Sequence, residues 1–110
     1  MILKNLPQDF IWGTATAAHQ VEGNNTNSDF WHLEHTKDTT FAEPSGIACD
    51  QWNKYEEDID IMADHSIQAY RLSVEWARIE TSEGEFSQEA IDHYKNCLLY
   101  TSPSPRDRTT

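Results

Sequence analysis

Residues 19–23, His-Gln-Val-Glu-Gly, hold the first side chains whose chemistry suits ligand binding. The Gln20 amide offers two donors and one acceptor, and these match adjacent sugar hydroxyls, which themselves donate and accept. The same amide could merely hold its loop in place, and the spacing does not separate these two roles. We expect His19 and Glu22 to be structural and Gly23 to form a turn.

A second candidate, Arg71, lies in a segment that predicts a strand. Residues 69–76 alternate strictly between apolar and polar types, which is the period of two that a strand requires. The polar face, which is either solvated or lines a site, consists of Ala69, Arg71, Ser73 and Glu75.

Other groupings of reactive side chains do not predict a site. His32 and His35 form one HxxH pair with Cys49 farther along, but a structural zinc centre needs two such pairs. The four glycines are scattered, so the chain has no Gly-rich phosphate loop. We therefore expect no metal and no cofactor.

Apolar periodicity predicts the elements that position Gln20 and Arg71. Residues 10–15 form a short apolar run, which is typical of a fully buried strand. A long polar stretch follows over 16–47, with one helical turn predicted at 28–34. Such a length without regular structure usually marks a functional loop.

The clearest helix is predicted over residues 50–65. Asp50 is placed to cap it, because its carboxylate can accept from the free amides of the first turn. A stripe at helical spacing, which we expect to face the core, consists of Trp52, Tyr55, Ile59, Met62 and Ala63.

A second helix is predicted from about residue 88 to 95, with Ser87 as its cap and Phe86 and Ile91 as a hydrophobic staple. The order strand, long loop, helix, strand, loop, helix predicts an α/β fold with a parallel sheet. In such folds the ligand site lies at the carboxyl ends of the strands, where Gln20 is placed.

Length and charge exclude several classes of partner. The 110 residues suffice for one small domain, and the net charge of −11 repels the phosphates of nucleic acid. No window approaches the roughly 20 apolar residues of a membrane span. Two cysteines are too few for a disulfide framework, so we expect a cytoplasmic location.

The last residues differ in composition from the rest of the chain. Residues 97–110 are rich in Ser, Thr, Arg and Pro, and Pro103 and Pro105 prevent a helix around them. This segment could be a frayed native terminus. However, residues 97–107 resemble the translation of a sequencing-library adapter joined to an incomplete gene. We predict a non-native tail over 97–110, after a domain at 1–96.

Two segments resemble motifs of glycoside hydrolase family 1, the β-glucosidases. The family's N-terminal signature is similar to residues 10–23, and its second-strand motif to residues 70–79. The helix between them also matches, and the resemblance covers about residues 6–96. It implies the first two βα units of a (β/α)8 TIM barrel, incomplete in this chain, from an enzyme that hydrolyses β-glycosides with retention.

The resemblance implies roles for two residues. Gln20 matches the glutamine that hydrogen-bonds the sugar in the innermost subsite, and Arg71 matches the arginine that contacts the nucleophilic carboxylate. A fixed guanidinium favours the ionised carboxylate and orients it, although Arg71 could also be an ordinary ion-pair partner in the barrel wall. We expect Glu75, Trp76 and Arg78 to be structural around the barrel mouth.

Three positions depart from the family's usual pattern. Thr81 stands where proline is common, and Ser66 stands where glycine commonly ends the helix. Ser66 therefore destabilises a left-handed cap. His19 replaces a more frequent aromatic residue and could bear on substrate preference.

The catalytic pair of the family has no counterpart here. Retaining hydrolysis requires two carboxylic groups about 5–5.5 Å apart. No acid lies in the Asn-Glu-Pro or Glu-Asn-Gly context where the family places them, and Glu43 precedes Pro44 but follows Ala42. We expect no catalytic residue in this chain, both glutamates on later strands, and no glycosidase activity from these 110 residues.

Three hypotheses follow for the parent protein. The first is a β-glucosidase acting on a β-glucoside or oligosaccharide. The second is a 6-phospho-β-glucosidase or β-galactosidase of the same family. The third is a non-catalytic sugar-binding or interaction module. The sequence indicates no oligomeric state.

Overall fold

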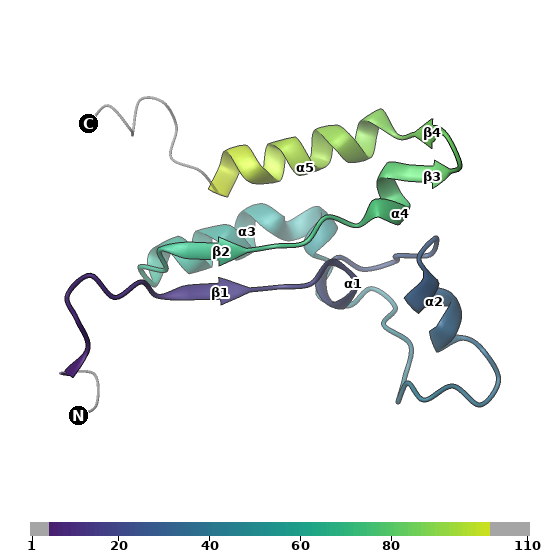
Figure 1. Cartoon of the computed structure of the whole chain (residues 1–110), viewed down its shortest axis with the longest axis horizontal. Helices are drawn as coiled ribbons and strands as arrows, with labels where there is room; N and C mark the ends of the chain where they lie inside the picture. Colours follow the sequence, from purple (N-terminus) through teal and green to yellow (C-terminus); the bar gives the residue numbers. More distant parts are fainter. Residues whose placement is uncertain (1–4, 102–110) are drawn as a thin grey trace.

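The computed structural model describes residues 5–101 (Figure 1). In Figure 1, β1 and β2 lie side by side, α3 lies behind β2, and α5 lies above it. The elements follow in the order β1 (Gly13–Ala15), α1 (Ala18–Val21), α2 (Asp29–Glu34), α3 (Gln51–Asp64), β2 (Ala69–Arg71), α4 (Trp76–Ile79), β3 (Glu80–Ser82), β4 (Glu85–Phe86) and α5 (Gln88–Thr101).

The first two strands, β1 and β2, form a parallel pair, which confirms the predicted parallel arrangement. Ala15 lies opposite Arg71 at the carboxyl end of both strands. Both strands are shorter than predicted: β1 begins three residues later than expected, and β2 ends at Arg71 because β1 turns into α1 and no longer pairs with it. The Thr16 amide still donates to the Arg71 carbonyl at 2.9 Å, whereas the Ala18 amide donates to the Ser73 hydroxyl at 2.7 Å.

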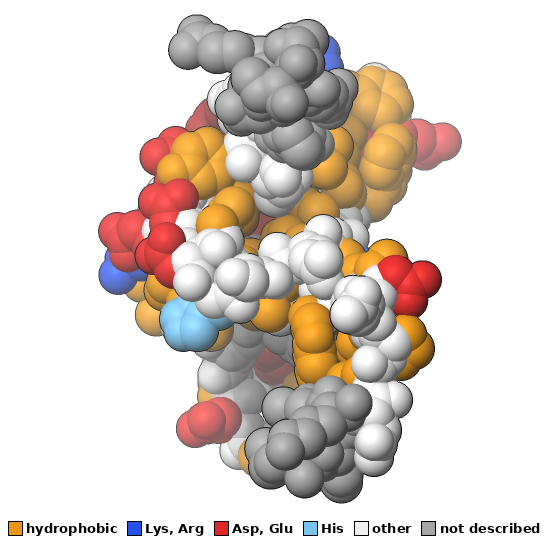
Figure 2. Space-filling model, turned by 90° about the vertical axis from the view of Figure 1, so that its left-hand side faces the viewer, with side chains coloured by type: hydrophobic (Ala, Val, Ile, Leu, Met, Phe, Trp, Pro, Cys, Tyr) orange, Lys and Arg blue, Asp and Glu red, His pale blue; other side chains and the backbone are white. Residues whose placement is uncertain are grey.

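The prediction of a fully buried first strand is wrong for the described residues. All three residues of β1 are exposed, and so are the apolar residues before it, Phe10, Ile11 and Trp12. An apolar strand is buried only where neighbouring elements cover it, and the elements within 5–101 leave this one open. Figure 2 likewise shows hydrophobic side chains at the surface of the view between the two grey termini.

Helix α3 begins at Gln51, but Asp50 does not cap it as predicted. Asp50 has a left-handed φ of 52°, and its carboxylate accepts no hydrogen bond from a first-turn amide. It accepts instead from the side chain of Asn53 at 2.9 Å. The Asp50 backbone carbonyl accepts from the amides of Asn53 and Lys54 at 3.1 and 3.0 Å. The main chain therefore closes the first turn.

The predicted apolar stripe of α3 contacts α5. The Trp52 ring stacks on His93, with centroids 3.5 Å apart, and Tyr55 lies edge-on to the same imidazole. Trp52 also packs against the small core cluster of Ile79, Ala90 and Tyr94. No residue within α3 is fully buried, so this packing leaves the stripe partly exposed.

The start of α5 confirms the predicted cap. The Ser87 hydroxyl accepts from the Ala90 amide at 3.2 Å. The two residues of the predicted staple pack against different neighbours: Phe86 lies edge-on to Trp76, and Ile91 packs on the core cluster.

Helix α5 extends past residue 95, where the prediction ended it, to Thr101. Cys97 is buried on this helix, and burial raises the pKa of its thiol to about 11. The predicted boundary between 96 and 97 falls inside α5, and residues 102–110 of the predicted tail lie outside the described residues. Within 5–101, no helix has both the length and the apolar character that a membrane crossing requires.

Ser66, directly after α3, has a left-handed φ of 60°. We predict that S66G stabilises the end of α3 by about 0.5–1 kcal/mol, because glycine adopts this conformation without the steric cost that Cβ imposes. Amide hydrogen exchange in the last turn of α3 measures the effect. The control, S82G in strand β3, should destabilise its own hairpin, and faster exchange in α3 of S66G would contradict the prediction.

Candidate functional site

The candidate site lies at the carboxyl edge of the β1–β2 pair. Gln20 is in α1, which follows β1 directly, and Arg71 is the last residue of β2. The bond from the Ala18 amide to Ser73 joins the two segments just beyond this edge. Both Gln20 and Arg71 are exposed, and within residues 5–101 their side chains make no hydrogen bond or ion pair. The edge thus presents two unengaged polar groups.

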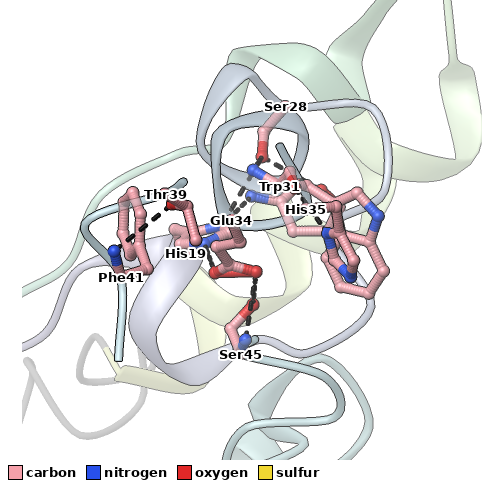
Figure 3. Close-up of polar contacts among 9 residues, drawn as sticks. His19, Ser28, Trp31, Glu34, His35, Thr39, Phe41 and Ser45 are labelled. Carbon is pink, nitrogen blue, oxygen red and sulfur yellow. Dashed lines mark hydrogen bonds and ion pairs between the residues drawn. The ribbon is translucent and has the colours of Figure 1, made fainter. Parts of the chain in front are cut away.

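A polar contact fixes α1 to the long segment that follows it (Figure 3). His19 Nε2 lies 2.6 Å from Glu34 Oε2, and Glu34 Oε1 accepts from the amide and hydroxyl of Ser45 at 3.0 and 2.9 Å. Removal from water raises the pKa of the Glu34 carboxyl, but the hydrogen bonds from Ser45 and His19 outweigh this and lower its pKa overall. The Glu34 carboxyl is therefore ionised at neutral pH and accepts hydrogen bonds from His19 and Ser45.

A buried carboxylate holds the other end of α1. Glu22 Oε1 pairs with Arg78 Nε at 2.8 Å, and Glu22 Oε2 accepts from the Tyr94 hydroxyl. The Tyr94 oxygen in turn accepts from the Glu75 amide at 3.0 Å. Burial raises the pKa of Glu22 more than Tyr94 and Arg78 lower it, and burial together with Glu22 raises the pKa of Tyr94. This Glu22 network joins α1, α4 and α5.

Gly23 completes the turn after α1, as expected. Its φ is +90°, and a Cβ placed on it would collide with the carbonyl of Ile47. The Arg78 guanidinium donates to the Gly23 carbonyl. Glycine is therefore required both for the backbone conformation and for the close approach of the segment around Ile47.

An aromatic stack packs α3 against the network. Trp52 has the His93 imidazole in a stacked contact and the Arg78 guanidinium 4.2 Å from its ring centroid. Burial, and secondarily the Arg78 charge, lowers the pKa of His93 to about 4. His93 is therefore a neutral aromatic partner near pH 7.

The structure agrees with the structural roles expected for His19, Glu22 and Arg78. It leaves Gln20 and Arg71 as the exposed polar groups of the edge. Sequence analysis missed Glu34, Ser45 and Tyr94. Glu34 and Ser45 lie in a polar stretch where nothing distinguishes a buried acid from a solvated one, whereas Tyr94 was detectable at helical spacing from Ala90 and Ile91.

Metal binding finds no support in the described part of the chain. Among residues 5–101, no three His, Cys, Asp or Glu side chains are close enough to share an ion. Glu43 is exposed in the long segment between α2 and α3.

Comparison with known proteins decides the family. The model of glycosyl hydrolase family 1 matches residues 2–101. The chain belongs to glycosyl hydrolase family 1. Its relatives in this family include Beta-glucosidase A of Acetivibrio thermocellus, which is 41% identical over 109 residues covering 90% of this chain and 24% of that protein. Beta-glucosidase A of Thermotoga maritima is 34% identical, covering 89% of this chain and 24% of that protein.

Solved structures of family 1 enzymes share the fold. The beta-glycosidase BGL167 is 59% identical with a TM-score of 0.82, and the match covers 87% of this chain and 23% of that one. The beta-glycosidase from Pyrococcus horikoshii is 35% identical with a TM-score of 0.78, covering 87% of this chain and 22% of that chain. This chain is therefore part of the family 1 TIM-barrel fold, and it spans about a quarter of the length of the relatives it matches.

The Glu22 network predicts a large effect of removing one hydroxyl. Y94F should lower the opening free energy of α5 by about 1–3 kcal/mol, because it leaves both the Glu22 carboxylate and the Glu75 amide short of a buried partner. Amide hydrogen exchange of α5 measures this loss. The control Y100F removes an exposed hydroxyl of α5 that donates to Asp60 of α3, and it should change α5 little. Equal effects of the two variants would contradict the assignment.

The His93 environment predicts a pH dependence. Its folded pKa, about 4, lies below the ordinary value of 6.5, so the unfolded chain binds more protons between these values. The α3–α5 contact should therefore lose stability as the pH falls from about 6.5 to about 4. H93F keeps an aromatic ring against Trp52 but has no titrating group there, so it should remove this pH dependence of the α3–α5 contact. NMR titration of the His93 ring gives the pKa directly, and a midpoint at or above 6.5 would exclude this environment.

Proposed function

We propose that this chain supplies the first two βα units of the barrel of a retaining β-glucosidase. In this proposal Gln20 hydrogen-bonds the hydroxyls of the sugar in the innermost subsite. The observation that carries the proposal is that the parallel β1–β2 pair brings Gln20 and Arg71 to one carboxyl edge, in a chain of family 1. This is the edge at which TIM barrels bind ligands.

Arg71 is proposed to orient the nucleophilic carboxylate. Among the described residues it has no ion-pair partner, whereas Arg78 is paired with Glu22. A guanidinium at hydrogen-bond distance keeps a carboxylate ionised, and a retaining glycosidase requires its nucleophile in that form. We propose that both catalytic carboxylates lie outside these 110 residues. The isolated chain then has no glycosidase activity.

The open apolar surface supports the same proposal. Large side chains are exposed just before β1, just after β2 and on α4: Trp12 at 47%, Val74 at 45% and Trp76 at 59%. In a closed barrel, neighbouring βα units cover such positions. We also propose a cytoplasmic location, because the chain has too few cysteines for a disulfide framework.

A hybrid barrel tests the function. Residues 1–96 of this chain replace the matching part of the beta-glycosidase BGL167, and hydrolysis of an aryl β-glucoside is measured. We expect turnover by the hybrid and none by the isolated chain. Turnover by the chain, with contaminating enzymes excluded, or a folded but inactive hybrid would overturn the proposal.

A cooperative melt of the isolated chain with saturable glucose binding would favour a binding module. Preference of the hybrid for 6-phosphoglucosides or galactosides would change the proposed substrate.

Within the hybrid, Gln20 is predicted to matter for catalytic efficiency. Q20A should lower kcat/KM by about 10–100-fold, the effect of losing one or two hydrogen bonds to substrate. The matched control is Q88A, which removes an exposed amide that bonds Asp92 on α5. If Q20A and Q88A give the same kcat/KM, Gln20 does not bind the sugar.

A further inference from the structure

Helix α1 is too short to be stable without tertiary contacts. It has four residues, and its ladder closes with one bond from the Glu22 amide to the Ala18 carbonyl at 2.9 Å. A single helical turn is unstable in isolation, so tertiary contacts must set its orientation. Ala18 and Glu22 fix its two ends through Ser73 and the Glu22 network. Between them lies His19, the neighbour of Gln20.

The partner of His19 belongs to a segment with little regular structure. Residues 22–50 contain only the six-residue helix α2, whose cap is the Ser28 hydroxyl accepting from the Trp31 amide. Glu34, at the end of α2 and 6% exposed, receives donors from two distant places, His19 and Ser45. Its carboxylate therefore ties α1 to both halves of this segment (Figure 3).

The contacts of the imidazole fix its proton. The Asn25 amide nitrogen lies 3.1 Å from His19 Nδ1, and because that nitrogen is a donor, Nδ1 accepts. The Ser28 hydroxyl, 3.5 Å from Nδ1, directs its own hydrogen to the Asn25 carbonyl. Because an ionised carboxylate can only accept, His19 Nε2 is the atom that donates to Glu34. The Phe30 ring, 5.5 Å between centroids, packs against the imidazole.

We propose that His19 is a positioning residue for substrate binding: its Nε2–H bond to Glu34 sets the orientation of α1 and so aims Gln20 at the sugar. The inference rests on the proposed function, because it acts through Gln20. A side chain without a donor at the position of Nε2 cannot make this bond. His19 therefore contributes to glycone binding without touching the substrate.

Two measurements test this role. In the full 110-residue chain, amide hydrogen exchange at Gln20 should accelerate in H19N, whose short amide cannot reach Glu34. It should stay close to the original rate in H19Q, whose amide nitrogen occupies the position of Nε2. H32N, at an exposed histidine of α2, is the control. Unchanged exchange in H19N, or equal acceleration in H19N and H19Q, overturns the proposal.

In the hybrid barrel, H19N should raise KM for the aryl β-glucoside about 10-fold and lower kcat by less than about 3-fold, with H19Q restoring KM. In a Q20A background, H19N should have no further effect on KM, because its action passes through Gln20. If the effects of H19N and Q20A on KM add, His19 does not act through Gln20 and has only a structural role, which would overturn the inference. If the unsubstituted hybrid is inactive, the proposed function fails, and the exchange measurement still decides whether His19 orients α1.

Discussion

The carboxylate of Glu22 is the interaction on which the described structure depends. A buried carboxylate is costly unless its charge is compensated, and here Arg78 supplies the opposite charge beside one oxygen while the Tyr94 hydroxyl donates to the other. These partners come from α4 and α5, so the network closes the unit built on β1 onto the unit built on β2. Burial raises the pKa of Glu22 more than Tyr94 and Arg78 lower it, so these partners offset only part of the cost of burying the charge.

The site follows from how α1 is held. Three contacts from different parts of the chain hold α1: Ser73 bonds the Ala18 amide, Glu34 bonds the His19 ring, and the Glu22 network holds the C-terminal end. Gln20 is left exposed among them. A binding group on a single turn of helix gains precision only through such supporting contacts. The described residues of this family 1 chain thus combine a firmly anchored edge with an apolar surface that they leave open.

The sequence predicted what depends on local pattern. The parallel pair, the helical turn over 28–34, the cap at Ser87 and the turn at Gly23 all follow from periodicity or from one residue's conformational preference. Burial of the first strand was wrong, because burial depends on elements that the described residues do not contain. The cap at Asp50 was wrong because its backbone took a left-handed conformation that turns the carboxylate away.

Polar pairs between residues far apart in the chain could not be predicted from the sequence. Nothing in the composition of residues 24–50 distinguishes Glu34 from the exposed acids around it, and its partner His19 is selected only by the fold. Side-chain chemistry and spacing made Gln20 and Arg71 candidates, the resemblance to family 1 supplied their roles, and the structure adds their common edge. Their roles in catalysis remain predictions that the hybrid barrel tests.

A double-mutant cycle on Glu22 and Arg78 tests the central claim most directly. The opening free energies of α1 and α5 are measured by amide hydrogen exchange in the original chain, E22Q, R78Q and the double variant. The Glu22 network predicts that each single change is strongly destabilising and that the double variant loses less than their sum, with a coupling of about 1–3 kcal/mol. Additive effects would contradict it, because they would show that the two groups do not act together in holding α1 in place.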